Sequence, residues 1–158
     1  MKKNITTKKR ILLAIALVIT IVTIVIDQYS KFLVLTKVNQ DPFVVFPFLN
    51  IVSVWNKGIS FGILSNTQYS NILFFCTAML IVSILIYLSF RDEGKNILPY
   101  SLIIGGGVAN IIDRMNYGAV FDFIDFHIGK YHWPAFNVAD SAIFIGIVFL
   151  LLNLKKEK

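Results

Sequence analysis

The sequence predicts an all-α membrane protein of four transmembrane helices, with a small extracytoplasmic β-sheet platform between the first two helices. The chain has 158 residues, of which 56% are hydrophobic and 15% are charged, and its mean hydropathy is +0.72. This composition is far from that of an average soluble domain. Long apolar runs recur along the chain, and the basic residues lie at their ends. The length leaves room for one compact domain, residues 1–158.

The first apolar run begins at residue 11, after five basic residues in the N-terminal tail. A secretory signal begins in the same way, but no small-x-small cleavage site follows this run. We therefore expect an uncleaved first helix over about residues 11–28.

The segment between the first two spans, about residues 41–65, is rich in Phe, Val and Ile and contains Pro42, Pro47 and two glycines. Short apolar stretches broken by turn residues are typical of strands. We expect a small sheet at the outer membrane surface, with Trp55 and the phenylalanines reaching into the interface. The alternative is a poorly ordered connection.

Three further apolar runs approach the ~20 residues that cross a hydrocarbon layer of about 30 Å. The second span, residues 69–90, has 22 residues without a charge. The third is expected over about residues 96–113, and the fourth over about residues 136–154. Only Asp140, near its start, interrupts the fourth. The triplet Gly105–Gly107 lies inside the third span, which favours close helix packing over a nucleotide-binding loop.

The basic residues favour a topology with both termini in the cytoplasm, because Lys and Arg concentrate in short cytoplasmic loops. With this topology ten basic residues lie inside and five outside. Most of the acids then lie at or beyond the outer face, namely Asp27, Asp41, Asp113, Asp122, Asp125 and Asp140. The basic residues behind the net charge of +6 therefore lie at the ends of the spans and do not form one basic face. We expect no nucleic-acid partner.

Polar residues beside two spans form a repeated pattern. Asn110 and Asp113 end the third span, and Asn137 and Asp140 open the fourth, each pair at an i, i+3 spacing that places both side chains on one helix face. Ionisable groups in membrane spans cost about 2.5–3.5 kcal/mol at a helix centre and less toward the ends. Asp140 has no basic neighbour in sequence, an environment that perturbs a carboxyl group.

A structural role explains some of these acids. Asp27 and Lys31 are one helical turn apart and are expected to pair, and Asp113 has Arg114 beside it. The single cysteine, Cys76, lies in an uncharged run and is expected to be ordinary packing.

Metal and serine chemistry find little support. H-E-x-x-H and S-x-x-K are absent, and His127 and His132 lie five residues apart in a loop, so we expect no metal and no other cofactor. What remains is a set of carboxylates at the outer surface. Two carboxyl groups that share one proton can hydrolyse a peptide, because the ionised one takes a proton from water and the protonated one gives a proton to the carbonyl oxygen.

Five short motifs follow one another along the chain. They are D-Q-x-(S/T)-K at residues 27–31, N-x-G-x-x-F-G at 56–62, N-x-x-D-R at 110–114, V-x-D-F at 120–123 and F-N-x-A-D-S at 136–141. In this order and spacing they resemble the motifs of the lipoprotein signal peptidase (signal peptidase II) family over nearly the whole chain. One departure is Ala109, where the family usually has glycine.

The resemblance implies an aspartic endopeptidase with Asp122 and Asp140 as the catalytic dyad, while Asp125 matches no catalytic position. The residues that it implies for substrate binding or site support are Asn56, Gly58, Asn110, Asp113, Arg114 and Asn137. The implied substrate is a bacterial prolipoprotein carrying diacylglycerol on a cysteine, cleaved just before that cysteine. The implied location is the bacterial cytoplasmic (inner) membrane, with the active site near its outer face. We expect a monomer in contact with membrane lipid.

A small proton-coupled transporter is the alternative from another class, because membrane carboxylates also serve as proton relays. Relays tend to lie near the midplane, whereas these acids gather at one face. A non-catalytic assembly protein is a third interpretation. The repeated N-x-x-D pairs argue against it, since an interface helix gains little from retaining them.

Overall fold

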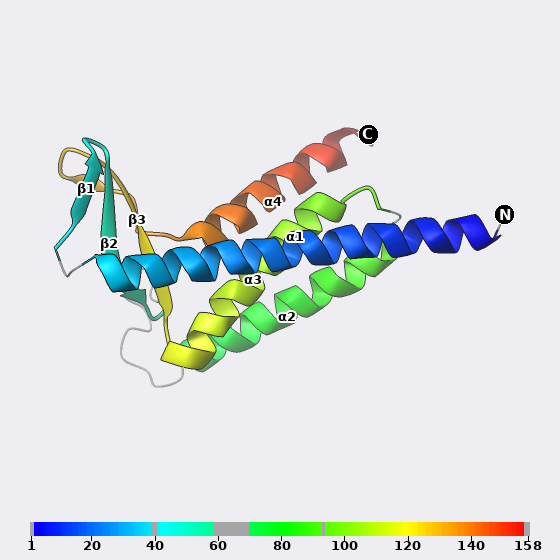
Figure 1. Cartoon of the computed structure of the whole chain (residues 1–158), viewed down its shortest axis with the longest axis horizontal. Coiled ribbons are helices and arrows are strands. Elements are labelled where there is room, and N and C mark those ends of the chain that lie inside the picture. The colour runs from blue at the N-terminus through cyan, green and yellow to red at the C-terminus, as the bar shows by residue number, and fades with distance from the viewer. Residues whose placement is uncertain (1, 39–40, 59–69, 93, 157–158) are drawn as a thin grey trace.

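The computed structural model describes residues 2–38, 41–58, 70–92 and 94–156. The helices within these ranges are α1 (Lys2–Lys37), α2 (Ser70–Arg91), α3 (Ile97–Tyr117) and α4 (Val138–Lys156). The strands are β1 (Phe43–Phe46), β2 (Leu49–Asn56), β3 (Val120–Ile128) and β4 (Tyr131–His132). The helices form an elongated bundle, and the sheet lies at one end of it, opposite the two chain termini (Figure 1).

Each predicted span falls on a helix, but two helices run well past the predicted ends. α1 continues to Lys37 and α3 to Tyr117. α3 stops there because Gly118 adopts a left-handed φ of 70° and donates its N–H to the carbonyl oxygen of Arg114 at 3.1 Å. Within the described residues, α1, α2 and α4 are long and apolar enough to cross a membrane. Residue 69, the predicted start of the second span, lies outside the described residues.

α3 is the central helix and contacts α1, α2 and α4. Three successive glycines make this possible, because each faces a different neighbour. A Cβ atom on Gly105 would lie 2.8 Å from the Cβ of Thr23 in α1, and one on Gly107 would lie 2.7 Å from Cγ2 of Val82 in α2. A Cβ on Gly106 would collide with the backbone carbonyl oxygen of Ala139 in α4. The prediction of close packing at this triplet is confirmed.

The four described strands form one antiparallel sheet in the order β1-β2-β3-β4. The prediction that the platform comes from residues 41–65 was therefore incomplete. β1 and β2 come from that segment, whose residues 59–65 lie outside the described part, but β3 and β4 come from the connection between α3 and α4. β3 shows little alternation because its first four residues are all buried, so the pattern that reveals a half-exposed strand is missing.

Aromatic rings hold the sheet together and tie it to the bundle. Phe46 of β1, Phe48 in the turn between β1 and β2, and Phe126 of β3 stack on one another, with ring centroids 5.6 and 6.4 Å apart. Trp55 packs on Tyr117 at the end of α3 and on the buried Phe121 of β3, at 5.1 and 5.0 Å. Such ring pairs add about 0.5–1.5 kcal/mol each beyond their burial. The start of β3 is thereby fixed beside the end of α3.

Gly106→Ala is expected to destabilise the protein more than Gly107→Ala. The new methyl group at position 106 meets backbone, so α4 must shift, at a cost of about 1–3 kcal/mol. The methyl group at position 107 meets only the end of the Val82 side chain, and both variants share the gain in helix propensity. Unfolding in detergent measures the difference, and equal stability of the two variants would contradict this packing.

Candidate active site

A buried ionic cluster joins α1 to α3. The ammonium group of Lys31 lies 2.6 Å from Oδ2 of Asp27 and 2.7 Å from Oδ2 of Asp113. All three residues are at most 3% exposed. The predicted pairing of Asp27 with Lys31 is confirmed. The structural role expected for Asp113 is also confirmed, but its basic partner is Lys31 and not the sequence neighbour Arg114, because Asp113 faces the interior of the bundle.

The same two carboxylates hold the backbone of the following elements. Asp27 accepts a hydrogen bond from the backbone N–H of Ala139 at 2.8 Å, in the first turn of α4. Asp113 accepts one from the N–H of Phe121 at 3.2 Å, at the start of β3, and one from the side chain of Gln28 at 2.8 Å. The ionic cluster therefore sets where β3 and α4 begin.

Arg114 points to a different neighbour. Its Nη1 donates to Oδ1 of Asn71 at 3.2 Å, and its guanidinium lies over the ring of Phe74, 5.3 Å from the centroid. Arg114 therefore fastens the C-terminal end of α3 to the first turns of α2. The side chain still lies within electrostatic range of Asp113, Asp122 and Asp140.

Asn137 and Asp140 form a reciprocal cap at the start of α4. The backbone N–H of Asp140 donates to Oδ1 of Asn137 at 2.9 Å, and the N–H of Asn137 donates to Oδ2 of Asp140 at 3.3 Å. Such a capping box satisfies backbone donors that the first helical turn leaves free. The other oxygen of Asp140 accepts a hydrogen bond from Nδ2 of Asn110 in α3 at 2.8 Å.

Asp122 reaches this cap from β3. Its Oδ1 accepts a hydrogen bond from Nδ2 of Asn137 at 2.7 Å, and its Oδ2 accepts one from Nδ2 of Asn56 at 2.9 Å. Asn56 is held in turn by the N–H of Gly58, which donates to its Oδ1 at 2.8 Å. Gly58 has a φ of 88°, and a Cβ there would collide with the ring of Phe74, so this tight turn requires glycine.

The structure thus gathers most of the sequence-predicted site residues in one place. Asn137, fully buried, contacts both Asp122 and Asp140. Asn110 contacts Asp140, Asn137 and Lys31. Residues 59–62 of the second motif lie outside the described residues. Sequence reasoning gave Lys31 only one partner, Asp27. The available signal for a larger structural role was its position one turn after Asp27 on an apolar helix, where a lysine has no evident role at the surface.

The electrostatics of Asp122 differ from those of an exposed carboxyl group. Its pKa is raised to about 6, and burial is the main cause. The charge of Asp140 acts in the same direction, while the hydrogen bonds from Asn56 and Asn137 lower the pKa. A proton shared near neutral pH is what acid-base chemistry by two carboxyl groups requires.

Asp125 belongs to a separate cluster with side chains of β2 and β4. It accepts hydrogen bonds from Nδ1 of His132 at 2.9 Å and Nδ2 of Asn50 at 3.1 Å. Burial alone would raise the pKa of Asp125, but these hydrogen bonds outweigh it and lower the pKa. His127 stacks on His132 at 4.9 Å. Among the described residues, no group of three His, Cys, Asp or Glu side chains is arranged to hold a metal ion.

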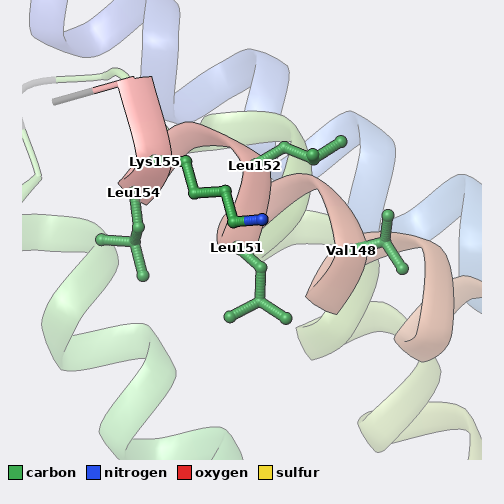
Figure 2. A pocket seen from close by; sticks show the side chains of 5 residues that line it. All are labelled: Val148, Leu151, Leu152, Leu154 and Lys155. Atoms are coloured by element: carbon green, nitrogen blue, oxygen red, sulfur yellow. The ribbon is translucent and has the colours of Figure 1, made fainter. Parts of the chain in front are cut away.

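Two hollows in the described structure lie away from these acids. One of about 430 Å³ is lined by α4 alone, through Val148, Leu151, Leu152, Leu154 and Lys155, and the leucines project from the helix surface in Figure 2. An apolar depression on one helix suits lipid contact and supplies no chemistry. A larger groove lies near the chain termini.

Comparison with known proteins decides the family. The family model described as signal peptidase (SPase) II matches residues 19–156. The chain belongs to the signal peptidase II family. A lipoprotein signal peptidase of Thermodesulfovibrio yellowstonii is 47% identical over 84% of the chain and 90% of that relative, and one of Anaplasma phagocytophilum is 40% identical over 90% and 94%.

Solved structures of similar proteins agree with this family assignment. A bacterial membrane enzyme solved at 1.9 Å resolution is 34% identical, covers 92% of the chain and 95% of its own length, and superimposes with a TM-score of 0.81. Membership of the signal peptidase II family makes the chain a peptidase, and it gives no support to the proton-coupled transporter.

Lys31→Met is expected to destabilise this signal peptidase II family member by about 3–5 kcal/mol, because two buried carboxylates lose their shared counter-ion. Lys37→Met at the exposed end of α1 is the matched control and should have little effect. Unfolding in mixed micelles compares them, and a fully stable Lys31→Met protein would rule out a structural role for the ionic cluster.

Proposed function

We propose that this chain is an aspartic signal peptidase that removes the signal peptide from prolipoproteins. The observation that carries the proposal is the junction at Asn137, where one amide side chain binds Asp122 and caps the helix that carries Asp140. Two carboxyl groups so joined, one with a pKa of about 6, can hold a single proton between them. Family membership supplies the reaction class.

In the proposed mechanism the ionised carboxylate of the dyad takes a proton from water, whose oxygen attacks the scissile carbonyl carbon. The protonated carboxyl group gives its proton to the carbonyl oxygen. As the tetrahedral intermediate collapses, the C–N bond breaks and the leaving nitrogen receives a proton from the dyad. The pair titrates jointly, so we assign the shared proton to both groups rather than to Asp122 or Asp140 alone.

The supporting residues hold the two acids in place. Asn56 and Asn137 each donate to one oxygen of Asp122, and Asn110 donates to Asp140. These hydrogen bonds hold the carboxyl planes in place, so that no reorganisation is needed during the reaction. Positioning of this kind contributes to the rate. Asp113 and Arg114 act indirectly. Asp113 binds Lys31, and Arg114 binds α2.

The proposed substrate carries diacylglycerol on its cysteine and is cleaved just before that cysteine. The surface of the sheet supports this choice. Its strands expose Phe43, Val44 and Phe46 at 61%, 67% and 52%, and Trp55 at 40%. Apolar and aromatic side chains of this kind favour the membrane interface, where a lipid anchor would hold a scissile bond.

We further propose a single membrane-embedded domain, active as a monomer and without nucleic-acid partners, in the bacterial cytoplasmic membrane. α3 is proposed as the fourth span because α1, α2 and α4 enclose it. Both chain ends lie at the opposite end of the bundle from the sheet (Figure 1), in keeping with cytoplasmic termini and a site near the outer face. The metal-free mechanism stays a prediction.

Asp122→Asn and Asp140→Asn are each expected to lower cleavage of a lipobox peptide with diacylglycerol on its cysteine by about 10²–10⁴-fold, because asparagine cannot exchange the proton. The double variant should be little worse than either one, since the two act as a unit. Asp125→Asn is the matched control on β3 and should stay active, because Asp125 binds His132.

Ser60→Ala is a second control for the dyad. Residues 58–62 also fit the G-x-S-x-G pattern of serine nucleophiles, and Ser60 lies outside the described residues. Under the aspartic mechanism Ser60→Ala retains activity. A folded Ser60→Ala protein without turnover, or Asp122→Asn protein with near-normal turnover, would overturn the dyad.

Cleavage is expected to decline as the pH rises above about 6. The pKa of Asp122 is raised to about 6, so the proton that the dyad needs is lost above that pH, while full protonation at low pH removes the base. A profile of kcat/KM over roughly pH 5 to 9 tests this. Asp125→Asn should keep the same profile, whereas a flat profile in the unmodified enzyme would contradict a shared proton.

Cysteine labelling tests the proposed topology. The chain has one cysteine, Cys76, so Cys76→Ser provides a background for single new cysteines. Lys155→Cys, near the end of α4, should be protected from an impermeant reagent added outside intact cells, and Lys130→Cys, between β3 and β4, should react. The reverse pattern would invert the topology.

A further inference from the structure

A groove of about 890 Å³ runs along the bundle at the end that carries the chain termini. α1 and α2 both pack on α3, but in the described part of the chain no Cα atom of α1 lies within 8 Å of one in α2. The groove between them has a floor formed by Ile104 and Val108 of α3. Its walls include Leu13 and Leu17 of α1 and Phe90 of α2.

The polar side chains inside the groove are mostly engaged with the helices themselves. Thr20 donates to the carbonyl oxygen of Ser101 at 3.3 Å. Ser101 and Ser89 donate to the carbonyl oxygens of Ile97 and Ile86, each at 2.7 Å. The groove therefore presents a mainly apolar surface, and an apolar chain fills it better than water does.

The mouth of the groove is basic. Lys8 and Lys9 of α1 and Arg91 at the end of α2 line it. Asp92 is the acid at the same mouth, and its carboxylate already accepts hydrogen bonds from the N–H and Nδ2 of Asn96 at 2.8 and 3.1 Å. The side chains that line the mouth thus carry an excess of positive charge above an apolar cleft.

We propose that this groove binds one anionic phospholipid, with an acyl chain between α1 and α2 and the phosphate near Lys8, Lys9 and Arg91. Basic pockets between transmembrane helices on the cytoplasmic side are suited to anionic headgroups, and each nearby basic residue attracts such lipids. The apolar helix of a signal peptide is the competing occupant. It begins with a basic segment, which the basic mouth would repel.

The bound lipid is expected to be retained selectively. The full chain is reconstituted in nanodiscs of phosphatidylcholine with a minor fraction of phosphatidylglycerol, then transferred to mild detergent for native mass spectrometry. One phosphatidylglycerol per chain should remain bound while phosphatidylcholine is lost. This measurement does not use cleavage, so its outcome is independent of the proposed peptidase activity.

Two matched pairs of variants locate the site. Combining Lys8→Gln with Lys9→Gln should weaken phosphatidylglycerol retention by about 30-fold, whereas Arg10→Gln, on the same helix but outside the groove lining, should leave it near the parent level. Ala16→Phe places a ring in the groove and should abolish retention. Ala14→Phe, on the exposed side of α1, should not.

Three results would overturn the proposal. Equal retention of phosphatidylcholine and phosphatidylglycerol would remove the role of the basic mouth. Equal loss in the Lys8→Gln, Lys9→Gln double variant and in Arg10→Gln would show diffuse charge attraction instead of a site. Full retention by Ala16→Phe would place the lipid elsewhere. The lysine variants lie on the surface, so they test the site even if the Ala16→Phe protein does not fold.

Discussion

The position of Lys31 between two buried carboxylates is the constraint on which the rest of the site depends. In a low-dielectric interior an unpaired charge is costly, so the ammonium group and its partners, Asp27 and Asp113, must stay together. The two carboxylates also accept hydrogen bonds from the first turn of α4 and from the start of β3. One ionic cluster thus determines where the elements that carry the proposed catalytic acids begin.

Helix packing sets the remaining distances. Because the three glycines of α3 face three different helices, α3 lies in close contact with all of them. The glycine that faces α4 contacts the carbonyl of Ala139, the residue directly before Asp140. Any change in the separation of α3 and α4 would therefore also change the hydrogen bond from Asn110 to Asp140. A change in packing inside the bundle is therefore transmitted directly to the site.

Sequence alone predicted the helices, the Asp27–Lys31 pair and the closeness of the N-x-x-D pairs, because each depends on contacts within a helix or between neighbouring helices. β3 and the true partner of Asp113 were missed. Both depend on the arrangement of segments far apart in the chain: β3 is buried on all sides at its start, and Asp113 meets a lysine from another helix. The roles of Asp122 and Asp140 were inferred from the order of the motifs along the chain. The hydrophobic periodicity of the sequence carries no information about them.

The cap at the start of α4 bears on the order in which the site assembles. Asp140 takes its geometry from Asn137, only three residues away, so this half can form as soon as α4 has its first turn. Asp122 takes its geometry partly from Asn56, 66 residues distant, and must wait for β2 and β3 to pair. In the complete chain, the helix cap can therefore form before the two acids are positioned to share a proton.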